Sequence, residues 1–317
     1  MKSRLFVLQV LLFAIFSFFL FLSMTEIAKL NSPFAKFNHE VPSYNGKEEF
    51  DPSLARLNTM QKLETYCDSL YNARLANPSV GGPGPRDNYP ELTSAVIRER
   101  FYHGYSCYDF TNNYMALLLE PFFPNKMVSA IVVTEDMMKY SYAACSQQSI
   151  ICMELLAKKG YSTRRIGFDG GEKYGGHFSF EVYYGGQWHF FDPNKEPDMA
   201  VLDKYNQPGI EFLAQQDDIL LAAYRKLPSN NVLALYKNYS YGRPNVFEAN
   251  NALLYQRATK ILSYIFWVFP FIALLFVRKR YLRLSHSTHV WNNRIYIPKF
   301  GRKGSPAYYP ESETQGA

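Results

Sequence analysis

The chain has 317 residues but only four cysteines. So few cysteines in a chain of this length exclude the disulfide framework that stabilises small secreted domains. In an oxidising compartment Cys67 and Cys107 could be free or paired, since their spacing favours neither state. The sequence also has no CxxC and no HExxH motif. It therefore lacks the usual zinc patterns, and we expect no metal and no other cofactor.

The larger part of the chain has no excess of charge of either sign. The net charge of +6 comes from the segment after Val277, which has eight Lys or Arg and two Glu. Residues 1–277 are therefore neutral overall. Domains that bind nucleic acids concentrate basic residues on their folded part, so we expect no nucleic-acid partner.

Two long apolar runs, residues 5–23 and 261–277, contain no charged residue. A bilayer-spanning helix needs about 20 apolar residues, so both runs are predicted to be transmembrane helices, the second kinked at Pro270. The alternative for residues 5–23 is a cleaved signal peptide, but the run is long for one and no A-x-A-type site follows it. The alternative for residues 261–277 is a buried core helix, which charged residues at both ends disfavour. Runs without internal charge also argue against a channel or transporter.

The distribution of basic residues predicts the orientation in the membrane. Lys2 and Arg4 precede the first run and a basic cluster (278–283) follows the second, whereas residues 24–260 have no basic excess. By the positive-inside rule, both termini are expected in the cytoplasm and the intervening part outside it. In a bacterial cell this predicts a multi-pass inner-membrane protein with a periplasmic domain.

These observations predict six segments. They are a cytoplasmic N-terminus (1–4), a transmembrane helix (5–23), a stalk and helical lead-in (24–90), an extracytoplasmic domain (91–258), a second transmembrane helix (261–277) and a basic cytoplasmic tail (278–317). A Gly/Pro-rich loop at 77–90 is the expected internal boundary. Apolar periodicity predicts helices over 55–75, 91–102 and 108–122.

From Cys145 onward the pattern indicates one helix followed by an antiparallel sheet. The helix is expected over CSQQSIICMELLAKKG (145–160), ending in a glycine cap. A strand, TRRIGF (163–168), and a glycine-rich loop (168–176) follow. The next two strands, GHFSFEVYY (176–184) and QWHFF (187–191), flank two glycines that form a two-residue hairpin signal.

The hairpin predicts which side chains share a face of the sheet. With Gly185 and Gly186 as the turn, Asp192 lies one diagonal step from His177, with about 7 Å between backbones. Since side chains alternate between faces with a period of two, these two project from the same face and can form a hydrogen bond. His189 falls on the opposite face and fails this test.

Cys145, His177 and Asp192 are therefore the candidate catalytic residues. Cys145 begins a helix, where free backbone N–H groups and the helix dipole favour a thiolate. A histidine held by a carboxylate is the base that activates such a nucleophile. The backbone N–H of Cys145 is a natural oxyanion donor. Cys152, inside the same helix, is expected to be a core residue.

At these residues the chain resembles the transglutaminase-like superfamily, whose core is papain-like. The pattern appears in order as Cys145, Leu155-Leu156, Gly160, Arg164, His177, Trp188 and Asp192-Pro193. It covers about residues 140–196, and its arginine is expected to form a structural ion pair. The resemblance implies an α+β fold in which the Cys-bearing helix packs on an antiparallel β-sheet, with extra helices and the two transmembrane helices added.

The resemblance also implies a cysteine enzyme with a thioester intermediate. In such an enzyme Cys145 would attack an amide or ester, His177 would transfer the proton, and Asp192 would orient His177. Release by water would make the chain a peptidase or amidase, and release by an amine an acyl transferase. Its substrate would be a peptide, a protein or a cell-envelope component. The alternative is an inactive binding or scaffolding module at the membrane, because Ala144 and Ser179 replace the glycine and tryptophan common in the family.

Overall fold

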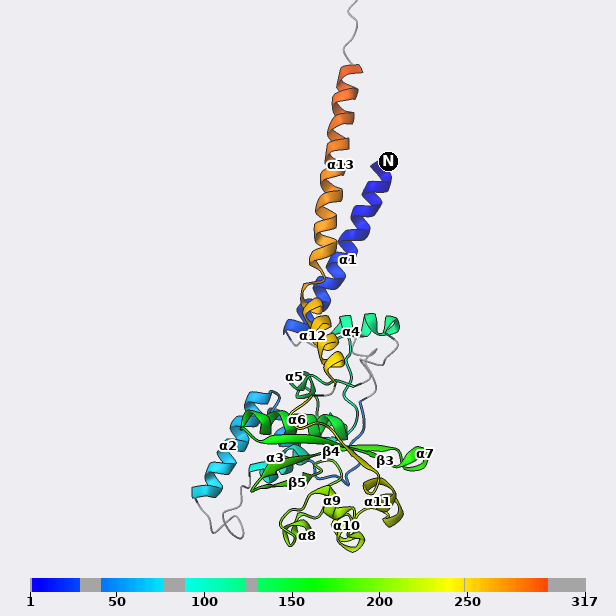
Figure 1. Cartoon of the computed structure of the whole chain (residues 1–317). Helices are drawn as coiled ribbons and strands as arrows, with labels where there is room; N and C mark the ends of the chain where they lie inside the picture. Colours follow the sequence, from blue (N-terminus) through cyan, green and yellow to red (C-terminus); the bar gives the residue numbers. More distant parts are fainter. Residues whose placement is uncertain (1, 29–40, 77–88, 124–129, 248, 296–317) are drawn as a thin grey trace, which may run out of the picture. The chain divides into compact units, whose positions relative to one another are not determined.

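The computed structural model describes residues 2–28, 41–76, 89–123, 130–247 and 249–295. The predicted boundary loop (77–88), most of the predicted stalk (29–40) and the end of the predicted tail (296–317) lie outside these ranges. The chain forms two compact units, one comprising Met1–Leu20 with Phe266–Ala317 and the other Phe21–Ile265. The fold is α+β, as the sequence predicts (Figure 1).

The helices, in chain order, are α1 (Lys2–Ala28), η2 (Pro52–Arg56), α2 (Met60–Ala76), α3 (Tyr89–Arg100), α4 (Tyr114–Leu119), η4 (Glu120–Phe122), α5 (Thr134–Met137), α6 (Cys145–Lys158), α7 (Gly171–Tyr174), α8 (Met199–Asp203), α9 (Ile210–Leu213), α10 (Asp217–Ala223), α11 (Ser229–Tyr236), α12 (Asn250–Ile265) and α13 (Val268–Ile295). The strands are β1 (Tyr102–His103), β2 (Tyr142–Ala143), β3 (Ser162–Asp169), β4 (Gly176–Tyr184), β5 (Gln187–Phe191) and β6 (Tyr239–Tyr241).

Among the described residues, α1 is the one helix that is long and apolar enough by itself to cross a membrane, a property that signal sequences share. The second predicted span is not continuous, because α12 ends at Ile265 and α13 begins at Val268. Only the two helices together meet the same criterion. Pro270 lies in the first turn of α13, where a missing N–H costs no helical hydrogen bond. The predicted kink is thus a break that precedes the proline.

Aromatic side chains hold the first unit together. The ring of Phe16 lies 5.2 Å from that of Phe271 and 6.1 Å from that of Trp267, and the rings of Phe19 and Phe266 meet edge to face at 4.6 Å. Such edge-on and tilted arrangements are the favoured geometries for aromatic pairs. The aromatic side chains of the run 5–23 therefore pack on those of the run 261–277.

The second unit is built on an antiparallel four-stranded sheet with the order β5-β4-β3-β6. Its helices form a layer on each face: α6 lies on one side, and α8 to α11 lie on the other (Figure 1). Each layer has its own core, since successive side chains of a strand point to opposite faces. In β4, Phe180 and Val182 join the core with α6, and in β5 Phe190 joins the core with α8 to α11.

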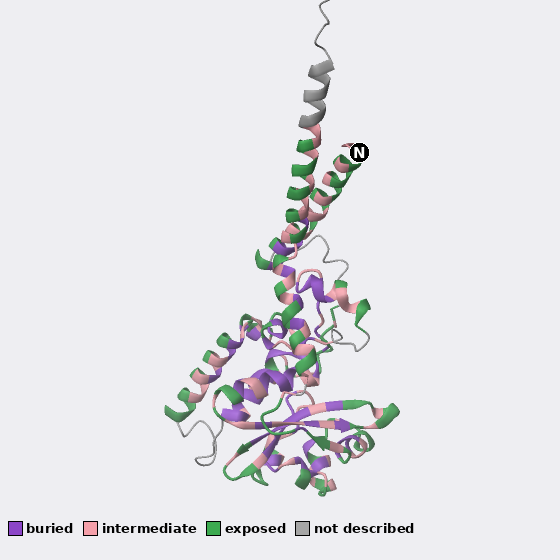
Figure 2. Ribbon diagram, turned by 45° about the horizontal axis from the view of Figure 1, so that its top comes forward, coloured by how far each residue is buried: buried purple, intermediate pink, exposed green. Residues whose placement is uncertain are grey.

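The predicted lead-in is part of this second unit. Leu54, Met60, Leu63 and Cys67 are buried in the same core as α6. In Figure 2 the buried residues accordingly extend from the sheet through α6 to the inner face of α2. The compact domain therefore includes segments that the sequence pattern placed before it.

The helix predicted over 108–122 is shorter than expected and begins only at Tyr114. Asp109 and Asn112 pair as an isolated bridge, which forms a turn. Asn113 then has a left-handed backbone (φ 62°), and its side chain caps the helix by accepting from Ala116 N at 3.2 Å. Asparagine tolerates this conformation and is a strong helix N-cap, so it ends the turn and starts α4.

Candidate active site

The hairpin between β4 and β5 has the predicted register. Gly185 and Gly186 both have positive φ (58° and 84°), the conformation that a two-residue turn of this kind requires. Tyr184 pairs with Gln187, as predicted, and the ladder ends at the pair of Phe180 and Phe191. The two-glycine turn therefore also determines which face of the sheet His177 and Asp192, just beyond this ladder, project from.

His177 and Asp192 are in direct contact. The ring Nε2 of His177 donates a hydrogen bond of 2.8 Å to Oδ2 of Asp192, and both side chains are buried. They project from the sheet face that α8 to α11 cover. The structure thus brings together the two residues that the register predicted to share a face.

Two tyrosines that the sequence pattern did not indicate complete the environment of Asp192. Oδ2 accepts from Tyr236 at 2.7 Å and Tyr224 at 2.9 Å, and Oδ1 accepts from the backbone N–H of Lys195 at 3.1 Å. The tyrosine rings are stacked, with centroids 4.3 Å apart. Burial alone would raise the pKa of Asp192, but the charge of His177 and these donors lower it. The carboxylate therefore stays ionised.

The imidazole of His177 is held by aromatic rings as well as by the carboxylate. Phe168 stacks on it at 5.7 Å, and Tyr236 meets it edge-on at 6.0 Å. Burial disfavours the imidazolium, but the charge and hydrogen bond of Asp192, together with Cys145, raise the pKa of His177 to about 9. Because Asp192 occupies Nε2, Nδ1 is the nitrogen available to the thiol.

Cys145 is the first residue of α6 and is half-buried. One turn further on, Ser149 Oγ donates to the carbonyl of Phe178 at 3.3 Å, which holds this end of α6 against the start of β4. Burial raises the pKa of Cys145, but hydrogen bonding and charge from His177 and the backbone N–H of Phe178 outweigh it, and the pKa is lowered overall. The three predicted residues therefore form one site.

The first turn of α6 leaves its backbone donors uncapped by a side chain. Ala144 is the N-cap and makes no side-chain cap hydrogen bond. Gln147 instead orders the neighbouring backbone, since its Oε1 accepts from Ala144 N at 3.0 Å and Ser106 N at 3.1 Å, and its Nε2 donates to Ser106 O at 2.9 Å. A helix N-terminus with free N–H groups is suited to a developing negative charge.

The same glutamine brings a second segment to the site. β1 and β2 run parallel, with His103 beside Ala143, and Tyr105, two residues after β1, lies close enough to Cys145 to feel its charge. Tyr105 is 58% exposed. Its pKa is raised by partial burial and by the nearby charge of Cys145. His103, which no sequence pattern linked to the triad, accepts from Asn194 Nδ2 at 3.1 Å.

The other cysteines, His189 and Arg164 lie outside the triad. None of the four cysteines, all of which lie in the described ranges, forms a disulfide, and Cys152 is buried in the core. The ring nitrogens of His189 face the carbonyl oxygens of Gln207 and Tyr184, away from the triad. The predicted structural ion pair is present, since Arg164 contacts Glu181 at 2.6 Å. Within the described ranges, no cluster of His, Cys, Asp and Glu is arranged to hold a metal ion.

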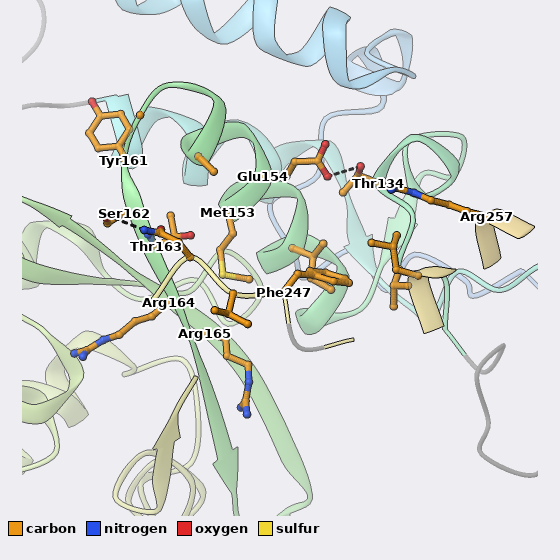
Figure 3. Close-up of a pocket in the computed structure, with 17 residues that line it drawn as sticks. Thr134, Met153, Glu154, Tyr161, Ser162, Thr163, Arg164, Arg165, Phe247 and Arg257 are labelled. Atoms are coloured by element: carbon orange, nitrogen blue, oxygen red, sulfur yellow. Dashed lines mark hydrogen bonds between the residues drawn. The ribbon is translucent and has the colours of Figure 1, made fainter. Parts of the chain in front are cut away.

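A separate cavity of about 540 Å³ lies on another side of α6 (Figure 3). Met153 of α6 and Phe247 approach each other in it, and Thr134 donates to Glu154 at 2.7 Å on its wall. None of the three triad residues lines this cavity. It is therefore distinct from the site at the start of α6.

No family model, curated protein or solved structure matches this chain.

Proposed function

We propose that the chain is a membrane-anchored cysteine enzyme of the transglutaminase-like type that cleaves or transfers an acyl group from an amide or ester. The observation that carries the proposal is the contact of 2.8 Å between His177 Nε2 and Asp192 Oδ2, which leaves Nδ1 for the thiol of Cys145. The lowered pKa of Cys145 and the raised pKa of His177 support a thiolate–imidazolium pair. A papain-like core, with the Cys-bearing helix on an antiparallel sheet, fits this arrangement.

The residues have distinct roles in the proposed reaction. The Cys145 thiolate attacks the carbonyl carbon, and the carbonyl oxygen becomes an oxyanion beside the N–H groups at the start of α6. His177 donates the Nδ1 proton to the departing amine or alcohol, which leaves a thioester on Cys145. Water or an amine then attacks the thioester as the neutral imidazole accepts its proton, and the thiolate departs. Asp192 orients the ring and stabilises its charged form throughout.

The buried tyrosines make this arrangement rigid before substrate arrives. Three hydrogen bonds converge on Asp192 Oδ2, from His177, Tyr224 and Tyr236. A carboxylate so held cannot turn away from the imidazole, and preorganised groups of this kind need little rearrangement in the transition state. We expect Tyr105, which is exposed and close enough to the thiol to feel its charge, to contact the acyl group of the substrate.

The location of the site defines the class of substrate. If α1 and the α12–α13 segment anchor the chain with both termini in the cytoplasm, the triad lies outside it. The substrate is then a peptide, a protein or a cell-envelope component in the periplasm. Residues 1–277 have no net charge, which agrees with a substrate other than nucleic acid.

A simple ester tests the proposal without knowledge of the natural substrate. The full-length chain in detergent is mixed with p-nitrophenyl acetate, and the release of p-nitrophenolate is followed. We expect a rapid burst and an acetyl adduct on Cys145 in the mass spectrum, both absent in Cys145→Ala. Added glycinamide then separates the two outcomes, because a transferase gives N-acetylglycinamide and a hydrolase gives acetate.

A matched cysteine distinguishes enzymatic from accidental acylation. Cys107 is also half-buried, but burial raises its pKa. Acetylation of Cys107 at the same rate as Cys145, with no burst, would refute the proposal and favour the non-catalytic binding module.

A further inference from the structure

The short segment formed by α4 and η4 exposes an unusual set of apolar side chains. Phe122 is 75% exposed, Phe123 40% and Leu118 39%. In the sequence YMALLLEPFF (114–123) Glu120 is the one charged residue. Exposed apolar side chains that cluster in this way mark a contact with another apolar phase or molecule. We call these three residues the apolar tip.

Hydrogen bonds connect the beginning of α4 to the ends of the apolar runs that belong to the same unit. The hydroxyl groups of Tyr114 and Ser23 lie 3.1 Å apart, and Ser23 Oγ donates to the carbonyl of Ser263 at 2.6 Å. Ser23 is the last residue of the run 5–23, and Ser263 is the third residue of the run 261–277. The first residue of α4 therefore contacts the first run directly, and Ser23 links it to the second run.

The other end of the segment lies along α12. The hydroxyl of Tyr255 donates to Ala116 O at 3.2 Å, and its ring lies 4.8 Å from that of Phe123. Figure 1 shows α4 beside α12 accordingly. The surface of α12 is itself apolar here, since Leu254 is 71% and Ile261 60% exposed. The apolar tip thus adjoins a helix surface of the same character.

A buried asparagine fastens the segment in this position. Asn113 donates from Nδ2 to Gln256 O at 3.0 Å and to Thr259 Oγ1 at 3.1 Å, and its backbone N–H donates to Glu26 Oε1 at 3.0 Å. Asn113 is fully buried. The segment is therefore held to the C-terminal end of α1 and to the middle of α12.

We infer that the apolar tip lies in the interfacial region of the lipid bilayer, as a third membrane contact beside the two anchors. Phenylalanine and leucine are the residues that interfacial segments bury at the boundary between headgroups and acyl chains. The occupant is lipid because the segment contacts Ser23 at the end of the first run and lies on α12 just before the second run begins, which is where the chain itself enters the apolar phase. The inference rests on the membrane anchors of the proposed function and not on the triad chemistry.

Photo-crosslinking of the full-length chain tests this inference. Benzoylphenylalanine is incorporated at Phe122 or at Phe212, and the protein is reconstituted in vesicles of phosphatidylethanolamine and phosphatidylglycerol. Phe212 on α9 is 41% exposed, within the second unit but away from α4. We expect lipid adducts at position 122 at least about tenfold above those at position 212. Phe123, 40% exposed, is the closest match to Phe212 and serves as the second variant if the first misfolds.

A third labelled position separates failure of the inference from failure of the membrane anchors. Benzoylphenylalanine at Phe18, inside the run 5–23, reports whether the anchor is inserted. Lipid adducts at position 18 without adducts at 122 and 123 would overturn the inference but leave the anchors intact. A crosslink from position 122 to a second copy of the chain or to another protein would overturn it as well. Absence of lipid adducts at all positions would refute both the inference and the anchors, while p-nitrophenyl acetate would still test the triad.

Discussion

The ring Nε2 of His177 lies 2.8 Å from Oδ2 of Asp192, although the residues are 15 positions apart and only His177 lies within a strand. The contact follows from the hairpin, because a shift of one residue in register would move Asp192 to the other face of the sheet. Asp192 lies just beyond the last residue of β5, and Tyr224 and Tyr236 hold it there. The proposed chemistry therefore depends on a turn of two glycines.

Replacement of the triad carboxylate tests the role of this contact. Asp192→Asn keeps the shape but removes the charge that stabilises the imidazolium, so the pKa of His177 should fall and the thiolate be lost. We expect the acetylation rate of Cys145 to decrease by about 10²- to 10⁴-fold. Asp198→Asn is the control, since Asp198 caps α8 and pairs with Arg225. Equal rates in Asp192→Asn and the unsubstituted chain would contradict the assignment.

Removal of one tyrosine hydroxyl tests the support of the carboxylate. Tyr236→Phe deletes a hydrogen bond of 2.7 Å to a buried charge, and such bonds contribute about 1.5–3 kcal/mol. We expect the free energy of unfolding in urea to fall by about 1–3 kcal/mol, together with the acetylation rate. Tyr239→Phe is matched, because Tyr239 is only half-buried and packs on Tyr241. A loss of stability without any loss of rate would limit Tyr236 to a structural role.

The hairpin and the pair on its face were predictable because both rules are local. A two-residue glycine turn sets the register, and the period of two sets the faces. The contacts of Tyr224 and Tyr236 with Asp192 were not predictable. They depend on how α10 and α11 pack on the sheet, and no sequence motif near Asp192 indicates that packing. The late start of α4 has a similar cause, because Asn113 bonds to Glu26 and Gln256, both far along the chain.

The pH dependence of the proposed reaction follows from the two shifted groups. The acid limb belongs to Cys145, whose pKa lies below the ordinary thiol value of 9.0, and the alkaline limb to His177, whose pKa is about 9. Activity should therefore rise as Cys145 ionises and fall as pH passes through about 9, where the imidazolium loses its proton. Because p-nitrophenolate departs without a proton, both limbs are measured with a peptide p-nitroanilide, whose leaving amine must take the proton of His177, from the initial rate of p-nitroaniline release.

A variant assigns the acid limb of that profile. In His177→Ala the burial of Cys145 remains but its charged partner is lost, so the pKa of Cys145 should exceed the ordinary value of 9.0. The ultraviolet absorbance of the thiolate, taken as a difference from Cys145→Ala, reports this directly. A thiolate that titrates at the same pH with and without His177 would show that the two groups are not coupled.

The rate at which each cysteine reacts with iodoacetamide tests the central claim most directly. The four thiols provide internal controls, since burial raises the pKa of Cys67 to about 12, that of Cys107 above its usual value and that of Cys152 well above it. In the native full-length chain near neutral pH, Cys145 should be alkylated at least about tenfold faster than Cys107. Cys67 and Cys152 should react only after unfolding. If Cys107 reacts as fast as Cys145, or Cys145 reacts only in denaturant, the catalytic triad proposed here is wrong.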